Sequence, residues 1–379
     1  MKVSILGTRG IPASHGGFET FAEHLAIYLS KRGHQVTVYC QSYTKGSTRE
    51  DTWNGIQRVT LYGSPTPVGS IAFDGAAALH ACRRPGIILT LGYNTAILSA
   101  LYYFSGKSSL MNMDGLEWQR EKWSRLQRLW LRLNERAGAI LSDHLIADHP
   151  DIGAYLSQFT SKEKISVIPY EYEPITDADP ALLEPYGLTP KGYAIVIARA
   201  EPENSLLEIV QAFSRKPRGI KLLILGRYYP ETNRYHRKVM DAAGPEVLFG
   251  SAVYNKDVVR ALRFFARAYI HGHRVGGTNP SLVESLAAGN PVIAHDNRFT
   301  RWVAGPKQEY FSGADHLSEI FDTFFDDMTR LLEMAVASRA RHREVFTPEK
   351  VLPIYEQLLL RFARGAECRV ASGITEADV

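Results

Sequence analysis

"HGHRVGGTNPSLVESLAAGNPVIAHD", residues 271–296, joins two short apolar runs through one helical segment. The run AYIHG leads into it, and PVIAHD ends it. Asn279 is a good N-cap, Pro280 suits the first helical position and Gly289 suits the C-terminal end, which predicts a helix over about 280–288. A strand, a helix and a second strand in this order form a βαβ unit of a parallel sheet.

The same alternation of short apolar runs and helical patterns returns along the 379-residue chain. In the first half, VSILGT and QVTVYC flank a helix that begins near Phe18, and in the second half YAIVIAR, KLLILG and VLFG are strand-like. We therefore predict an α/β protein with two Rossmann-like, doubly wound parallel-sheet domains that face a central cleft. The predicted parts are a first domain (1–174), a linker (175–192), a second domain (193–345), a C-terminal helix that packs back toward the first domain (346–365) and a mobile tail (366–379).

Composition excludes several classes of protein. Lys and Arg exceed Asp and Glu by only 44 − 40 = 4, which does not indicate a nucleic-acid-binding protein. Cys40, Cys82 and Cys368 are widely spaced and odd in number, so neither a disulfide framework nor a zinc site is expected. The sequence shows no signal peptide and no apolar stretch of bilayer length. We expect a cytoplasmic protein without a bound metal.

The loop GTRGIPASHGGFE (residues 7–19) follows the first predicted strand. Its glycines do not have the G-x-G-x-x-G spacing of a dinucleotide-binding loop, so a Rossmann dehydrogenase is not expected. Gly16 and Gly17 lie at a helix N-terminus, where the loop either binds an anion or only needs small residues to enter the helix. Polar side chains nearby favour a functional role for this loop: Arg9, His15 and Glu19.

The loop before the helix at 280–288 is a second candidate anion-binding loop at a helix N-terminus. Gly276, Gly277 and Thr278 lie at the positive end of this helix, where backbone N–H groups can hold a diphosphate. Glu284 is one turn further on. Its carboxylate either accepts hydrogen bonds from sugar or ribose hydroxyls, or simply complements the helix dipole.

At these residues the sequence resembles a known family. GGTNPSLVESLAAGNPVIA is similar to the donor-binding segment of glycosyltransferase family 4, whose enzymes have the GT-B fold of two Rossmann-like domains and retain anomeric configuration. The resemblance extends to GTRGIPASHGGFETFAEHLA, DGLEWQREKW and ARAEPENSLLEIVQAF. It is nearest to the branch of bacterial rhamnosyltransferases that assemble cell-surface polysaccharides.

The resemblance implies roles for particular residues. Glu284 resembles the second glutamate of the family's paired-glutamate motif, which holds the nucleotide ribose. Arg199 resembles the arginine that meets the donor diphosphate, where a fixed cation neutralises the leaving group. Gly16 and Gly17 resemble the glycine pair that approaches donor phosphate and acceptor.

The sequence departs from the family pattern on the donor side. Gly276 stands where the first glutamate of the pair is found, so the sugar contact must come from elsewhere, with His271, His273 or backbone groups as candidates. The usual phosphate-binding lysine is absent, and Asn204, which carries no charge, is nearest to its place. Asn279 completes the predicted donor loop.

A third departure concerns the first domain. Asp114 replaces a common active-site histidine and could orient an acceptor hydroxyl or take its proton, although Asp-Gly is also an ordinary turn signal. Glu117 follows it as in the family pattern. The resemblance implies a metal-independent, retaining transfer of a hexose such as L-rhamnose. Its donor would be a dTDP- or UDP-linked sugar, used as substrate with no further cofactor, and its acceptor a glycan or a polyprenyl-diphosphate-linked oligosaccharide.

Two alternatives stay open at the level of sequence. The missing glutamate and lysine also fit a non-catalytic sugar-nucleotide or glycan-binding protein of the same fold, and a nucleotide-sugar epimerase is a third reading. The segment 117–136 adds a question about partners, because Trp123, Leu126, Trp130 and Leu133 recur at helical spacing among arginines. We expect this stripe to pack on the core. Peripheral contact with an anionic membrane, on the inner face of the cell membrane, is the competing hypothesis.

Overall fold

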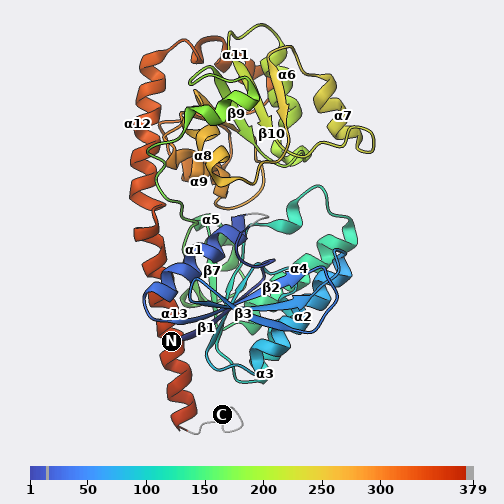
Figure 1. Cartoon of the computed structure of the whole chain (residues 1–379), viewed down its shortest axis with the longest axis vertical. Helices are drawn as coiled ribbons and strands as arrows, with labels where there is room; N and C mark the ends of the chain where they lie inside the picture. The colour runs from blue at the N-terminus through green and yellow to red at the C-terminus, as the bar shows by residue number, and fades with distance from the viewer. Residues whose placement is uncertain (14–16, 373–379) are drawn as a thin grey trace. The chain divides into compact units, whose positions relative to one another are not determined.

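The computed structural model describes residues 1–13 and 17–372, with side chains described as far as residue 364. The chain divides into two compact units. The first unit comprises Met1–Trp118, Trp123–Pro169 and the chain from Glu349 onward. The second unit comprises Gln119–Lys122 and Tyr170–Pro348. Each unit contains one sheet covered by helices (Figure 1).

The first unit is built on an eight-stranded sheet of order β3-β4-β2-β1-β5-β6-β7-β8. Its described strand pairs are parallel, as predicted, except for β3 with β4, an antiparallel edge that the sequence analysis did not include. Asn54 and Gly55 join these two strands with φ of 49° and 78°, as a two-residue hairpin turn requires. The strands are β1(Lys2–Leu6), β2(Gln35–Ser42), β3(Arg49–Trp53), β4(Ile56–Tyr62), β5(Ile87–Leu91), β6(Ser109–Asn112), β7(His144–Ala147) and β8(Ile165–Val167).

Helices cover this sheet on the faces where its apolar side chains point. Phe73 and Ala77 of α2 and Tyr102 of α3 share a buried core with the sheet residues Tyr39 and Val59. The described helices are α1(Gly17–Lys31), α2(Pro67–Cys82), η1(Ala96–Leu98), α3(Ser99–Phe104), η2(Glu117–Gln119), α4(Arg125–Leu141), α5(Pro150–Leu156), η3(Lys162–Lys164) and α13(Pro348–Ser372).

The second unit is built on a parallel six-stranded sheet of order β11-β10-β9-β12-β13-β14. Alternate residues of its strands enter two different cores: Ala194 and Val196 face one, whereas Tyr193 and Ile195 face the other. The strands are β9(Tyr193–Ile197), β10(Lys221–Leu225), β11(Val247–Gly250), β12(Ala268–His271), β13(Val292–His295) and β14(Glu309–Phe311). The helices are η4(Pro180–Tyr186), η5(Pro202–Asn204), α6(Leu206–Ser214), α7(Arg234–Asp241), α8(Lys256–Phe264), α9(Pro280–Ala287), α10(Arg298–Ala304), α11(Ala314–Phe324) and α12(Met328–Val345).

The strand order places the ligand-binding edge of each sheet. In the second unit the chain runs outward from β9 to β11, then returns to the other side of β9 with β12. Open α/β sheets bind ligands at the carboxyl ends of the strands where the order reverses. This rule selects the loops that follow β9 and β12. In the first unit it selects the loops after β1 and β5.

The predicted linker 175–192 lies inside the second unit. Ile175 N–H donates to the carbonyl of Ala287, and Leu183 and Leu188 are buried in the core of this unit. The chain passes from the first unit to the second at Pro169 and Tyr170. The Pro, Asp and Gly content of this segment is typical of a linker, but its two buried leucines anchor it to the second unit.

The C-terminal helix is longer than predicted. Helix α13 runs to Ser372 and, from Glu349, belongs to the first unit. The predicted tail 366–379 is therefore helical over its first residues, and 373–379 lie outside the described part of the chain.

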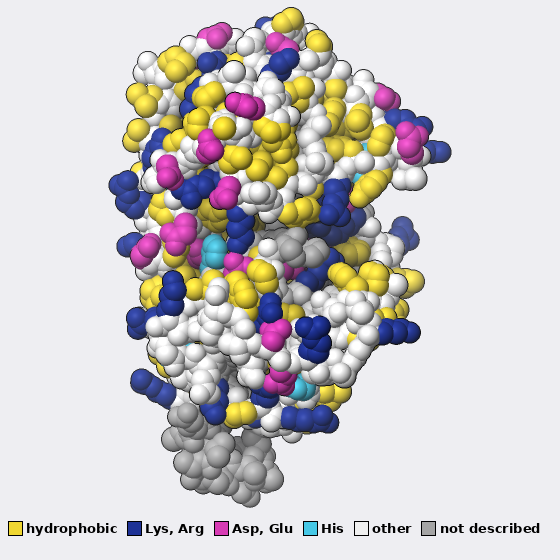
Figure 2. Space-filling model, in the orientation of Figure 1, with side chains coloured by type: hydrophobic (Ala, Val, Ile, Leu, Met, Phe, Trp, Pro, Cys, Tyr) yellow, Lys and Arg dark blue, Asp and Glu magenta, His cyan; other side chains and the backbone are white. Residues whose placement is uncertain are grey.

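The predicted burial of the stripe on 117–136 is wrong. Helix α4 begins at Arg125 behind a capping box formed by Ser124 and Gln127. Leu126 and Leu133 lie in its exposed face rather than in the core. Figure 2 shows apolar side chains beside Lys and Arg side chains where Figure 1 places this helix. No helix among the described residues is long and apolar enough to cross a membrane.

Candidate functional site

The loop after β9 carries Arg199 at the carboxyl edge of the second sheet. Its side chain is exposed and has no ion-pair partner among the described residues. Asn204 is buried, and its amide donates to the Arg199 carbonyl at 2.8 Å. Asn204 therefore shapes the loop that presents Arg199, and the ligand contact expected of it stays a prediction.

The loop after β12 lies directly against this first loop. A Cβ on Gly272 would lie 2.1 Å from the carbonyl oxygen of Asn204, so this close approach requires glycine. Arg274 joins the same two loops, since its backbone N–H donates to the Glu203 carbonyl at 2.9 Å and its guanidinium to the Pro202 carbonyl at 2.8 Å. The structure thus brings the two predicted donor loops together.

Helix α9 begins as the sequence predicts. The Asn279 side chain caps it by accepting from the Ser281 N–H at 3.0 Å, and Pro280 is its first residue. Gly276 has a φ of 150°, a conformation that few side chains adopt. Gly277 and the buried Thr278 complete the loop before the cap. Pro280 has no N–H group, and those of Ser281, Leu282 and Val283 donate to Asn279, so the helix start offers an anion the positive end of its dipole at the edge selected by the strand order.

Glu284 has a partner that the sequence did not reveal. Its carboxylate forms an ion pair with Arg263 of α8, with 2.6 Å between Oε2 and Nη2. The Arg263 side chain is 3% exposed and that of Glu284 is 20% exposed. Arg263 also donates to the Ser281 carbonyl and to the Ser285 hydroxyl. Glu284 is therefore held in one orientation by a buried cation.

His271 and His273 stack on each other at the end of β12. Their ring centroids are 4.3 Å apart, with 11° between the planes. Burial lowers the pKa of His271 to about 3, and the nearby Arg263 adds to this effect. Burial also lowers the pKa of His273 well below its usual value, with further contributions from His271, Arg120 and Arg199. Both rings are neutral at physiological pH and can each donate and accept a hydrogen bond.

Several buried polar atoms at this edge have no hydrogen-bond partner among the described residues: Glu203 Oε1 and Oε2, Ser205 Oγ, His271 Nε2, His273 Nδ1 and His295 Nδ1. Glu203 is 2% exposed. Buried polar groups are nearly always paired, so a cluster of unpaired ones indicates a place for a polar ligand or ordered water. Sequence reasoning missed Glu203, which lies beside Asn204 in EPENS, the segment that lacks the family's usual lysine.

A second feature missed by sequence reasoning is a cavity of about 430 Å³ behind the ends of β10 and β11. Tyr228, Phe249 and Arg227 are among its lining residues. The rings of Tyr228 and Phe249 lie edge to face at 5.0 Å. The Arg227 guanidinium lies 5.5 Å from the ring centre of Tyr254. Aromatic walls with one cation suit a planar, polar group such as a nucleobase.

In the first unit, Asp114 follows β6 in the left-handed conformation, with φ of 51°. Its N–H donates to Asn112 Oδ1 at 2.9 Å, which fixes the turn. Glu117 is buried, and its Oε1 accepts from the indole N–H of Trp123 at 3.2 Å. Both residues are therefore held by local hydrogen bonds. The turn that the Asp-Gly pair predicts is present at Asp114.

The glycine-rich loop after β1 is described in part. The Arg9 backbone N–H donates to Glu19 Oε1 at 3.3 Å, and Arg9 itself is exposed. Gly17 is the first residue of α1. His15 and Gly16 lie outside the described residues. The loop and the start of α1 are thus tied together through Glu19.

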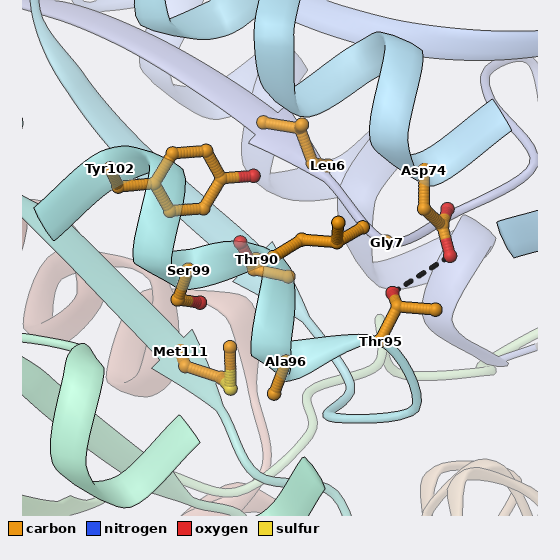
Figure 3. A pocket seen from close by; sticks show the side chains of 10 residues that line it. Leu6, Gly7, Asp74, Thr90, Thr95, Ala96, Ser99, Tyr102 and Met111 are labelled. Carbon is orange, nitrogen blue, oxygen red and sulfur yellow. Dashed lines mark hydrogen bonds between the residues drawn. The ribbon is translucent and has the colours of Figure 1, made fainter. Parts of the chain in front are cut away.

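Figure 3 shows a small cavity beneath this edge of the first sheet, lined in part by Leu6, Thr90 and Tyr102. Its volume of about 20 Å³ is enough for one water molecule and too small for a substrate. Asp74 lies at its rim and accepts a hydrogen bond from Thr95 at 2.8 Å. We therefore place no substrate there. Among the described residues, no group of three or more His, Cys, Asp or Glu is arranged to hold a metal ion.

Comparisons with known proteins agree with this architecture. The sequence model of Glycosyltransferase Family 4 matches residues 15–170. No curated protein matches. Sucrose-phosphate synthase from Thermosynechococcus elongatus is similar in structure, with a TM-score of 0.78 and 17% identity over 95% of this chain and 98% of that chain.

Two further solved structures are similar. HepE from Anabaena, in complex with UDP and glucose, has a TM-score of 0.74 and 14% identity over 95% of this chain and 100% of its own. An α,α-trehalose-phosphate synthase (UDP-forming) from Burkholderia vietnamiensis has a TM-score of 0.70 and 10% identity over 96% of this chain and 99% of its own. The chain therefore has the GT-B fold of these glycosyltransferase structures, and its residues 15–170 are similar to Glycosyltransferase Family 4.

Proposed function

We propose that this protein is a retaining, metal-independent glycosyltransferase that moves a hexose from a nucleotide-sugar donor to a glycan or a polyprenyl-diphosphate-linked acceptor in bacterial surface polysaccharide assembly. The proposed donor is L-rhamnose linked to dTDP or UDP, and this choice rests on the resemblance to the rhamnosyltransferase branch described above. The observation that carries the donor site is the cluster of unpaired buried polar atoms around Glu203, His271 and His273, beside Arg199.

The donor site follows from the charges and hydrogen-bonding groups at this edge. The exposed Arg199 guanidinium and the start of α9 supply positive charge for a diphosphate. Glu284, fixed by Arg263, accepts from the ribose hydroxyls. His271 and His273, being neutral, offer ring nitrogens to the sugar hydroxyls in place of the glutamate that is missing at Gly276. The aromatic cavity at Tyr228 takes the base.

The chemistry proposed is substitution at the anomeric carbon. The bond from this carbon to the donor phosphate breaks, the acceptor oxygen bonds to it on the same face, and the acceptor proton passes to the departing phosphate. Arg199 and the positive end of the α9 dipole stabilise the charge that develops on that phosphate. Asp114 is proposed to orient the acceptor hydroxyl. HepE, with its UDP and glucose, supports a nucleotide-sugar ligand for a protein of this fold.

The test is thermal stabilisation by dTDP, UDP, GDP and ADP and by their sugars, because a ligand that binds only the folded state raises the midpoint of unfolding. One nucleotide is expected to raise the midpoint of the wild type, and Arg199→Ala and Glu284→Ala are expected to abolish that rise. Arg343→Ala, an exposed arginine on α12, is the matched control.

Stabilisation by none of the nucleotides would contradict the donor site and favour the glycan-binding alternative. Release of free sugar or of an epimer from the donor at the same rate with and without acceptor would instead favour the epimerase alternative.

A further inference from the structure

Helix α4 turns most of its large apolar side chains away from the protein core. Its buried side is mixed, with Leu131 and Ala139 beside the polar Asn134 and Glu135, whereas Leu126, Leu129 and Leu133 are exposed. Leu126 is 80% exposed and Leu133 is 58% exposed. At about 100° per residue these two sets lie on opposite sides of the helix. A surface helix normally shows the reverse arrangement, so the apolar side of α4 faces outward.

Internal contacts hold α4 in this orientation. The Asn134 side chain accepts from the Ile97 N–H at 3.0 Å. Glu135 accepts from the Trp118 indole at 3.1 Å and from the Tyr155 hydroxyl at 2.7 Å. These bonds satisfy the polar groups of the buried side, so turning the helix over would leave them unpaired.

The exposed apolar side continues onto the neighbouring helices. Helix α3 packs against both α2 and α4, and η1 packs against α4. Phe104 at the end of α3 is 83% exposed. We call the outward side of these helices the α2–α4 face, and its exposed apolar residues are Val68, Ile71, Leu79, Ile97, Tyr103, Phe104, Leu126, Leu129, Trp130, Leu133 and Ile140. Apolar surface of this extent normally marks an interaction site.

The charged side chains that α2, α3 and α4 turn outward on this face have one sign. Arg125, Arg132 and Arg136 are exposed along one flank of the apolar stripe of α4. The Arg132 guanidinium rests on the Trp118 ring at 3.9 Å. The acidic residues of α2 and α4 are turned inward, since Glu135 is buried and Asp74 is bonded to Thr95. Apolar side chains flanked by arginine on one helix fit the interface of an anionic bilayer.

We propose that the α2–α4 face docks on an anionic lipid bilayer, with the leucines inserted among the acyl chains and the arginines at the phosphate level. A second copy of this chain fits less well, because a symmetric contact with the two α4 helices antiparallel would bring the arginine flank against itself, and one with the helices parallel would leave it without an opposite charge from α2, α3 or α4. The proposal goes beyond the proposed function. Bilayer binding needs neither donor nor acceptor. A protein that fails to bind vesicles can therefore be distinguished from one that fails to bind a nucleotide sugar.

The test is co-sedimentation of the whole protein with vesicles of phosphatidylcholine alone and of phosphatidylcholine with an equal part of phosphatidylglycerol. The wild type is expected to sediment with the anionic vesicles at low salt and to be released by high salt. The double variant Arg132→Gln with Arg136→Gln is expected to weaken binding roughly tenfold or more. Leu126→Asn with Leu133→Asn is expected to abolish it, with unchanged thermal stability, because both positions are exposed.

Matched controls come from elsewhere in the chain. Leu332→Asn with Val336→Asn removes two exposed apolar side chains of α12, and Arg343→Gln with Lys350→Gln removes two exposed charges. Both are expected to bind vesicles like the wild type. Absence of binding to anionic vesicles, or equal loss in the controls, would overturn the proposal. A wild-type dimer in lipid-free solution that Leu126→Asn with Leu133→Asn converts to monomer would also overturn it.

Discussion

Arg263 is the residue on which the geometry of α9 depends. It is buried, it pairs with Glu284, and it donates to the first and second turns of α9 at Ser281 and Ser285. Its guanidinium also lies 5.7 Å from the ring centre of Tyr269, whose hydroxyl contacts His271 at 3.2 Å. A single cation on α8 therefore connects the carboxylate, the helix start and the histidine pair.

This arrangement predicts the effect of removing Arg263. Arg263→Met leaves Glu284 without its partner inside the protein, and breaking a buried pair in this way costs about 3–5 kcal/mol of unfolding free energy. Arg260→Met is the matched control, since Arg260 lies one turn earlier on α8 and pairs with Asp177 at the surface. Its loss is expected to cost less than about 1 kcal/mol. Urea unfolding measures both, and equal midpoints for the two variants would contradict the assigned role.

The candidate site shows what sequence could and could not supply at the residue scale. The cap at Asn279 and the helix start at Pro280 are local properties of the sequence, and the structure has both. The partner of Glu284 was not predictable, because Arg263 is 21 residues away on another helix and only packing of α8 against α9 brings them together. Glu203 was missed for the same reason, since its place depends on contact with the loop after β12, where Arg274 N–H donates to its carbonyl.

At the scale of elements, strands and helices of the βαβ units follow their hydrophobic periodicity to within a few residues. Periodicity failed on α4, because it identifies the apolar side of a helix and says nothing of whether that side faces the core or the outside. The antiparallel edge at β3 was missed although Asn54-Gly55 is a strong hairpin signal. The linker was misplaced because two anchoring leucines outweigh a loop-like composition.

The contact of α2 with the segment before η1 predicts a pH effect. Burial raises the pKa of Asp74 to about 6, and the hydrogen bond from Thr95 only partly offsets this. Between about pH 4 and pH 6 the folded state binds more protons than the unfolded state, so this carboxyl lowers stability as pH rises through that window. The Asp74→Asn substitution is expected to raise the free energy of unfolding by roughly 2–3 kcal/mol at pH 7 and to leave it unchanged at pH 4.

Thermal unfolding across this pH range measures the difference. Asp51→Asn is the contrasting control, because the hydrogen bond from Arg58 lowers the pKa of Asp51. That variant is expected to lose stability at neutral pH. If the unfolding midpoints of Asp74→Asn and the wild type differ by the same amount from pH 4 to pH 8, the raised pKa assigned to Asp74 is wrong.

At the scale of the whole molecule, the chain leaves the first unit at Pro169, builds the second, and returns with α13. The return is anchored by a buried apolar side, with Leu352, Tyr355 and Leu359 in the core. Tyr355 also accepts a hydrogen bond from the amide of Asn112 at 2.9 Å. The first unit is therefore completed only by the C-terminal helix, which the sequence predicted to pack on this side.

Glu356 of α13 fixes this return electrostatically. It is buried, and its carboxylate accepts from Arg32 and His34 at 2.7 Å and from the Tyr28 hydroxyl at 3.1 Å. Burial alone would raise the pKa of Glu356, but these three hydrogen bonds together lower it. The carboxylate therefore adds stability above the pKa of an unfolded glutamate, and this contribution is lost as pH falls through the lowered folded value.

Glu356→Gln is accordingly expected to destabilise the first unit by about 1–3 kcal/mol at pH 7, with the difference from the wild type shrinking toward pH 3. Tryptophan fluorescence during urea unfolding reports mainly on this unit, which contains Trp53, Trp118, Trp123 and Trp130, whereas the second contains Trp302. Glu349→Gln, an exposed acid in the first turn of α13, serves as control and should change little. If Glu356→Gln unfolds at the wild-type midpoint at pH 7, the carboxylate does not hold α13 on the first unit, and its apolar side alone must do so.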